Sequence, residues 1–320
     1  MTVYTPEHTQ TFESLGIKPD HFKNIPTSIN RAILPRFAEM NDNGVNHLKS
    51  EQEMVAWYEN NKDEFDQFLI GNQLDAEFIS LFPYMIYIGD LGKTGGFSDI
   101  GGRKIIGKLY SYLFSAKHQE ALNKGFPYAN SEGSSPKFNQ LPIVRAVYLH
   151  YKLSGESEDQ YDIPNDEINY LMHLGFSPTK TTMQQFWSEA HIRCNEQLQE
   201  LADMKACPTA YKATELGSSH HFTQNVFPDS LRKSLDTNPN YIAENKGYFT
   251  VIALLEIMDK IEAFMHRDGN SPNSFSDAYN IVKNIVPTTL KSNFEDKPYY
   301  KELEEIYIQA FEFLKTHPPL

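Results

Sequence analysis

The sequence predicts an all-α protein. Apolar residues recur at the 3.6-residue spacing of amphipathic helices in one segment after another. No stretch shows the strict alternation of apolar and polar residues that is typical of a half-buried strand. The pairs Asn43-Gly44 and Asp268-Gly269, which in a β protein would mark hairpin turns, fall between helical patterns. We therefore expect a multi-helix bundle.

The expected helices begin after a proline-containing N-terminal stretch. Residues 1–45 are expected to form an irregular lead-in with short helices. Helices follow over 51–70 and 74–88, and the second of these ends at a glycine-rich segment, 89–102. The stretch 154–166 is polar and acidic and is expected to be exposed. Further helices are expected over 103–125, 141–153, 168–174, 182–204 and 209–221.

Three more helices are expected towards the C-terminus. The first, 249–267, carries Asp259 directly after an apolar run. The second begins at Ser274, with Asp277 three residues later in a variant of the capping box, and extends to Ile285. The last has one apolar face, formed by Leu303, Ile306, Tyr307, Ala310, Phe311 and Leu314.

The composition limits the classes of function. Hydrophobic residues make up 40% of the 320 residues and aromatic residues 13%, which is enough for a sizeable core. A net charge of -13 excludes a broad electrostatic surface for nucleic acid. A local basic or metal-lined cleft could still bind a phosphate ester.

The expected location is the cytoplasm. Cys194 and Cys207 are the two cysteines, so we expect reduced thiols, no disulfide framework and no cysteine-based zinc site. The N-terminus lacks a basic region followed by an apolar stretch, so no signal peptide is predicted. The longest apolar run, 78–88, is too short to span a membrane. Unconventional export would leave the same pattern.

Asp259 is the most informative single residue. Burying a carboxylate without a partner costs several kcal/mol. Asp259 therefore lies at the edge of its apolar helix face or points into the core towards a cation. Asp90 and the pair His220-His221 favour the second interpretation, because together with His191 they offer further carboxylate and imidazole ligands.

These residue types indicate a catalytic metal site. Imidazole nitrogens and carboxylate oxygens suit Zn, Mn, Fe or Ni, and a helical bundle can direct such side chains inward. A divalent metal there would polarise a phosphoryl oxygen and activate a bound water. Lys93, three residues after Asp90, could neutralise a phosphate.

The order of these segments resembles the HD-domain metal-dependent phosphohydrolases, and most closely the HD-GYP branch of cyclic-dinucleotide phosphodiesterases. The resemblance spans about residues 60–290. Gly89-Asp90-Leu-Gly-Lys93 is similar to the family's His-Asp-Ile-Gly-Lys, and 182–191 is similar to the segment leading to its next histidine. Ser219-His220-His221 is similar to the family's double histidine, and Val226-Phe227-Pro228 to the Gly-Tyr-Pro that follows it. Residues 251–267 are similar to the helix that carries the last metal-binding aspartate, and 276–282 to the next helix.

The sequence also departs from the family pattern. Gly89 replaces the histidine of the His-Asp pair, and Phe222 replaces the glutamate expected after the double histidine. The Gly-Tyr-Pro is reduced to Val-Phe-Pro. The family's first histidine has no clear match; His47, far upstream, is a candidate. One of the family's metal positions therefore looks damaged, while the other keeps its ligands.

The resemblance implies a domain organisation. It gives a lead-in over 1–60, an HD-like helical domain over 61–290, and an amphipathic helix over 291–320 packed on that domain. The chain between Lys93 and His191 is longer than the family requires, which implies an inserted helical lobe at about 100–175.

The resemblance also implies roles for single residues. Asp90, His191, His220 and Asp259 would hold a metal, with His221 as a further ligand or a proton donor. The metal would be a single Mn, Fe, Zn or Ni ion, or absent altogether. Lys93 and Arg267 would steady the phosphate oxygens of a nucleotide or related phosphoester.

Two other functions stay open beside this metal-dependent phosphodiesterase or phosphohydrolase. One is an HD-like phosphodiesterase without metal, in which histidines act as acid and base. The other is a degenerate member that only binds a nucleotide, or a partner protein through the inserted lobe.

Each pattern also has a purely structural interpretation. A Gly-Asp-Leu-Gly-Lys run is common where a helix ends in a turn. His191 could be a hydrogen-bonded core histidine, and neighbouring histidines on a helix do not share a face. Asp259 could pair with Lys260 or Arg267.

Overall fold

The computed structural model describes residues 11–42, 47–91, 192, 195, 198–266 and 274–319. Each regular element in these residues is a helix, so the all-α prediction is confirmed for this part of the chain. The expected helices 103–125, 141–153 and 168–174 and most of 182–204 lie outside the described residues. The inserted lobe at about 100–175 lies outside them too, so the domain organisation stays a prediction.

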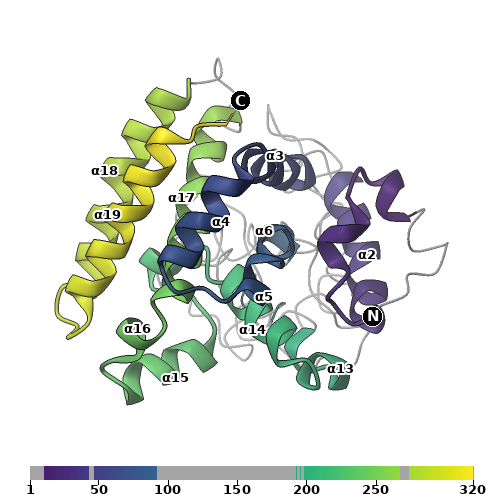
Figure 1. Cartoon of the computed structure of the whole chain (residues 1–320), viewed down its shortest axis with the longest axis horizontal. Coiled ribbons are helices and arrows are strands. Elements are labelled where there is room, and N and C mark those ends of the chain that lie inside the picture. The colour runs from purple at the N-terminus through teal and green to yellow at the C-terminus, as the bar shows by residue number, and fades with distance from the viewer. Residues whose placement is uncertain are drawn as a thin grey trace, which may run out of the picture.

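The described helices form two groups along the chain (Figure 1). The first comprises η1 (Pro19–Phe22), α2 (Thr27–Asp42), α3 (His47–Asn60), α4 (Lys62–Gly71), α5 (Ala76–Ile79) and α6 (Phe82–Gly89). The second comprises α13 (Ala202–Lys205), α14 (Pro208–Gly217), η5 (Phe222–Gln224), α15 (Asp229–Thr237), α16 (Tyr241–Glu244), α17 (Lys246–His266), α18 (Phe275–Phe294) and α19 (Tyr300–Thr316).

Helix α17 is the centre of the bundle. Every residue of 249–258 is buried, which is the pattern of a helix covered on all sides. It packs against α3, α4, α14, α16, α18, α19 and η5. The expected helix around Asp259 is therefore confirmed. Asp259 follows the most buried stretch directly and is half-buried.

Helix α6 lies in the middle of the view in Figure 1, packed against α3 and α14. All of its residues are buried. Pro83 stands in its first turn, where a helix needs no backbone N–H donor. Tyr84 Oη and Thr214 Oγ1, 2.7 Å apart, form a hydrogen bond between α6 and α14. The end of α6, with Asp90, is thereby held beside the turn that follows α14.

The start of α18 and the apolar face of α19 match their expected patterns. Ser274 Oγ accepts a hydrogen bond from the Asp277 N–H at 3.2 Å and donates one to the Asp277 carboxylate at 2.6 Å, so the capping interaction is confirmed. In α19 the six apolar residues of the expected face are all buried. Helices α18 and α19 pack against each other and against α17, side by side on the left of Figure 1.

Several expected helix boundaries differ from the structure. Residues 27–42, expected to belong to an irregular lead-in with short helices, form one helix of 16 residues. The helix expected over 51–70 is broken between α3 and α4 at Asn61, and the one expected over 74–88 is broken between α5 and α6. The helix expected to reach His221 ends at Gly217.

Helix α18 differs most, because it continues through Pro287 to Phe294. The proline ring removes one backbone donor. Pro287 and Lys283, whose carbonyl loses its partner, are both exposed, so water can replace that bond. Val286 and Leu290 are buried and continue the packing of the helix.

Among the described helices, none combines the length and the apolar character that crossing a bilayer requires.

Candidate metal centre

A small cavity lies where α3, α6, α17 and the end of α14 meet. Its volume is about 10 Å³. A cavity needs roughly 10–15 Å³ to hold one water molecule, so this space suits a single ion or water rather than a whole nucleotide. It is lined by Glu51, Met54, Met85, Ile86, Gly89, Asp90, Gly217, His220, Leu255 and Asp259.

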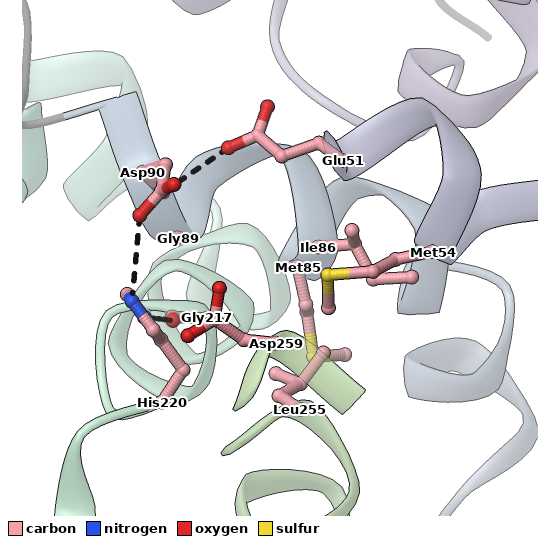
Figure 2. A pocket seen from close by; sticks show the side chains of 10 residues that line it. All are labelled: Glu51, Met54, Met85, Ile86, Gly89, Asp90, Gly217, His220, Leu255 and Asp259. Carbon is pink, nitrogen blue, oxygen red and sulfur yellow. Dashed lines mark hydrogen bonds and ion pairs between the residues drawn. The ribbon is translucent and has the colours of Figure 1, made fainter. Parts of the chain in front are cut away.

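The polar side chains lie together on one side of this cavity. Figure 2 shows Asp90, His220 and Asp259 pointing towards one another from three different elements, with Met54, Met85 and Leu255 on the apolar side. The ten lining residues include three carboxylates and neither lysine nor arginine. The described lining is thus rich in oxygen ligands.

Hydrogen bonding fixes the orientation of the His220 ring. Its Nδ1 lies 3.0 Å from the carbonyl oxygen of Gly217. A carbonyl only accepts, so Nδ1 carries the proton and donates. In the neutral ring, Nε2 then holds the lone pair, and it is directed at Asp90. A backbone carbonyl that orients a histidine through its other nitrogen is the usual arrangement behind a metal-binding imidazole.

The spacing of His220 and Asp90 fits two ligands of one ion. His220 Nε2 and Asp90 Oδ1 are 3.6 Å apart, and both side chains are almost completely buried. This distance exceeds a normal hydrogen bond. Two atoms that each lie about 2.1 Å from a shared ion would be separated by about 3.4–3.6 Å at near-tetrahedral angles.

His221 and Asp259 complete the cluster. One ligand atom each from His220, His221 and Asp259 can be chosen so that all three lie within 4.8 Å of one another. The two histidine rings have centroids 4.1 Å apart. They can approach the same point because α14 ends at Gly217, so neither ring is bound to a helix face. This corrects the expectation that the pair lies on a helix.

Glu51 is a member of the site that the sequence did not reveal. Its Oε1 accepts a hydrogen bond from the Asp90 N–H at 3.2 Å, and its side chain is buried. His47, the candidate for the family's first histidine, begins α3, and Glu51 follows it by four residues. Glu51 stood in an ordinary amphipathic pattern, and only the packing of α3 on α6 brings it to Asp90.

Gly89 is explained by the close packing of His220. A Cβ added at Gly89 would lie 3.2 Å from His220 Nδ1 and 3.4 Å from its Cε1. A side chain at this position would therefore press on the ring. The His220 ring occupies the space next to Gly89, where the resemblance leads one to expect a histidine.

Gly217 allows α14 to approach α6. A Cβ there would lie 2.3 Å from Ile88 Cγ2 and 2.6 Å from the Met85 carbonyl oxygen, which is closer than atoms can pack. The lack of a side chain at Gly217 lets the two helices touch. The contact brings His220, three residues on, within reach of Asp90.

A buried carboxylate on α17 holds the turn that carries the histidines. Glu256 is completely buried and accepts hydrogen bonds from the Thr223 N–H at 3.0 Å and from the Thr223 hydroxyl. It also accepts from Tyr307 Oη at 2.7 Å and pairs with Lys260 Nζ at 3.1 Å. Burial and the Glu256 carboxylate raise the pKa of Tyr307 well above its usual value, so the phenol stays a donor.

Glu256 thus connects the histidine turn with the helix that carries Asp259. Thr223 comes two residues after His221, and Asp259 comes three residues after Glu256 on the same helix. A side chain that anchors the turn to α17 also fixes the histidines relative to Asp259. Glu256 could not be identified from the sequence, because it lies within an apolar run and its partners Thr223 and Tyr307 are far away along the chain.

Three residues of the expected site lie outside the described residues: Lys93, His191 and Arg267. Their roles stay predictions. Asn195, four residues after His191, is buried and donates a hydrogen bond from Nδ2 to the Ile88 carbonyl oxygen at 3.1 Å. This bond ties its segment to the end of α6, two residues before Asp90.

No protein-family model matches the sequence, and neither the curated proteins nor the solved structures include one that is significantly similar to it. The chemistry of the site therefore rests on the described geometry.

The cluster can act as a binding site for a divalent cation. It offers imidazole nitrogens from two histidines and carboxylate oxygens from Asp90 and Asp259, with Glu51 behind Asp90. Mixed nitrogen and oxygen ligands suit Zn, Mn, Fe or Ni. The short spacing between the ligand atoms fits a single ion.

Proposed function

We propose that the protein is a metal-dependent phosphohydrolase or phosphodiesterase that acts on a nucleotide or a related phosphoester. The observation that carries this proposal is that Asp90, His220 and Asp259 line one small cavity inside the helical bundle, and that His221 has a ligand atom close to those of His220 and Asp259. The order of these residues in the sequence, which resembles that of the HD-domain phosphohydrolases, supports the same reaction class.

The residues present fit a divalent metal. When bound, such an ion would polarise a phosphoryl oxygen and lower the pKa of a bound water. His220 is held by Gly217 with Nε2 directed at Asp90, and Glu51 steadies Asp90 from behind. His221 is half-buried and serves as a further ligand or as the proton donor to the leaving group. Lys93 and Arg267 are the proposed contacts to phosphate oxygens.

A second candidate function is binding without catalysis. Phe222, at the position of the glutamate that the resemblance leads one to expect, is a core residue. Its ring stacks on Phe227 and Phe294, with centroids 4.6 Å and 5.1 Å apart. Gly89 also lacks a ligand atom. The resemblance leads one to expect a histidine at position 89 and a glutamate at position 222, and neither is present, which favours binding without catalysis.

Metal content and turnover separate these functions. The full chain is expressed with Mn, Fe, Zn or Ni supplementation, and its metal content is measured by mass spectrometry. Hydrolysis of bis(p-nitrophenyl) phosphate is then followed for the wild type and for Asp90→Asn and Asp259→Asn. Glu302→Gln, an exposed carboxylate on α19, is the matched control.

The proposal predicts about one equivalent of metal per chain and turnover that both site variants reduce at least a hundredfold. The control should match the wild type. Bound metal without turnover would favour the binding function. Turnover that survives chelators and depends on His220 would favour the metal-independent enzyme, and a metal-free chain without turnover would reject the proposal.

A further inference from the structure

A second and larger cavity lies between α3 and α17. Its volume is about 530 Å³, within the range of about 300–1,000 Å³ for small-molecule sites. Met54 lines both this cavity and the candidate metal centre. The lining residues are Glu53, Met54, Ala56, Trp57, Asn60, Glu262, Met265, His266, Phe275 and Pro319.

One wall of this cavity is aromatic and fixed in place. Trp57 Nε1 donates a hydrogen bond to the His317 carbonyl oxygen at 2.6 Å. The indole also meets the Phe275 ring edge-on, with centroids 5.7 Å apart and planes at 89°. Because its donor and one edge are already engaged, the indole offers a preorganised apolar surface. Met265 and Ala56 extend that surface.

The polar residues of the cavity give it a negative charge. His266 Nδ1 lies 3.1 Å from Glu53 Oε2 and 3.2 Å from Glu262 Oε1. The ten described lining residues carry two carboxylates and one histidine, so their net charge is -2 with a neutral ring and -1 with a protonated one.

We propose that this cavity binds a small amphipathic organic cation, such as an amine that carries an aromatic or aliphatic group. The ammonium would donate hydrogen bonds to Glu53 and Glu262, where charge-assisted bonds are strong. The apolar body would pack against Trp57, Phe275 and Met265, with a further attraction between the cation and the aromatic rings.

The size and walls of the cavity favour an organic cation over a metal ion. Glu53, Glu262 and His266 have ligand atoms within 4.8 Å of one another, so they could also hold a metal. A metal would use only that end of the space and leave the aromatic wall bare. A ligand with an ammonium and an apolar body would use both ends.

The proposal is independent of the proposed reaction and is tested with two matched probes. Phenethylamine and phenethyl alcohol have nearly the same shape, but only the amine is charged. Binding of each to the full chain is measured by calorimetry and by saturation-transfer NMR. The variants are Glu53→Gln/Glu262→Gln, Asp90→Asn and the exposed control Glu302→Gln, each checked for folding by circular dichroism.

The amine is expected to bind saturably and at least tenfold more tightly than the alcohol. The Glu53→Gln/Glu262→Gln variant should lose this preference, and Asp90→Asn and Glu302→Gln should keep it. If the double variant does not fold, Trp57→Phe provides the second test, because weaker cation–π attraction should reduce amine binding by a few fold. Equal binding of the amine and the alcohol, or no saturable binding of the amine, would overturn the proposal. So would a cavity that binds Mn²⁺ through Glu262 but does not bind the amine.

Discussion

Replacement of Glu256 by glutamine should destabilise the protein strongly, because a buried carboxylate with several donors becomes an amide. In the wild type one carboxylate oxygen accepts from the Thr223 N–H at 3.0 Å and from Tyr307 Oη at 2.7 Å. The other accepts from the Thr223 hydroxyl and pairs with Lys260 at 3.1 Å. The glutamine amide has a single acceptor oxygen. Its NH₂ group takes the place of the other carboxylate oxygen and faces the donors that this oxygen accepted from.

The magnitude follows from counting those donors. If the amide nitrogen faces the Thr223 hydroxyl, one buried donor loses its acceptor. If it faces the Thr223 N–H and Tyr307 Oη, two buried donors lose theirs. Each unsatisfied buried donor costs about 1–3 kcal/mol. Lys260 can turn towards water and is left out of the sum. We therefore expect the free energy of unfolding to fall by about 3 kcal/mol.

The assay is urea unfolding followed by circular dichroism, with Glu302→Gln as the exposed control. Metal affinity is measured on the same samples under conditions in which Glu256→Gln is still folded. It should fall, because Glu256 anchors the turn after His221. A loss of stability below about 0.5 kcal/mol together with unchanged metal affinity would refute this reasoning.

Three further predictions concern single contacts. Gly217→Ala should reduce the free energy of unfolding by about 1–3 kcal/mol and weaken metal binding, because the added Cβ would lie 2.3 Å from Ile88 Cγ2. Urea unfolding and metal titration measure the two effects, and wild-type values in both would contradict the close packing of α6 and α14. Ser274→Ala should cost about 1 kcal/mol in thermal unfolding through loss of the α18 cap, and Ser274→Asp should restore most of it. Burial lowers the pKa of His21 below its ordinary value of 6.5, even though the Glu59 carboxylate opposes the shift. As the pH falls below about 6.5, the unfolded chain takes up a proton that folded His21 resists, so the free energy of unfolding should decrease. This slope between pH 7 and 5.5 should flatten in His21→Gln, and an unchanged slope would contradict the assignment.

The helices could be predicted because burial in this protein follows local periodicity. The six apolar residues of α19 and the run before Asp259 repeat at helical spacing, and the structure buries them. Ser274 and Asp277 cap α18 through a contact three residues long, which the sequence contains completely. Helix ends were harder, because the packing of Val286 and Leu290 carries α18 past Pro287.

The grouping of the candidate site residues could be predicted in part. Asp90, His220 and Asp259 do share a cavity, and His221 joins His220 and Asp259 in one cluster. What distinguished these four residues in the sequence was a carboxylate or a histidine placed beside an apolar helical run or in a similar order to a known family.

Other parts of the site depend on contacts between distant segments. Glu51 reaches Asp90 across 39 positions, and Glu256 reaches Thr223 across 33. No local pattern distinguishes such carboxylates from those on a solvated helix face. Gly89 looked like a lost ligand in the sequence, and only the position of the His220 ring shows why a glycine fits there.

Anomalous diffraction from crystals grown with Mn²⁺ or Zn²⁺ would show directly whether these side chains hold a metal ion. We expect one peak about 2.0–2.2 Å from ligand atoms of His220, His221 and Asp259, with Asp90 in the same coordination sphere. A map without a peak at this cavity, or with the ion bound only by Glu53, Glu262 and His266, would contradict this expectation.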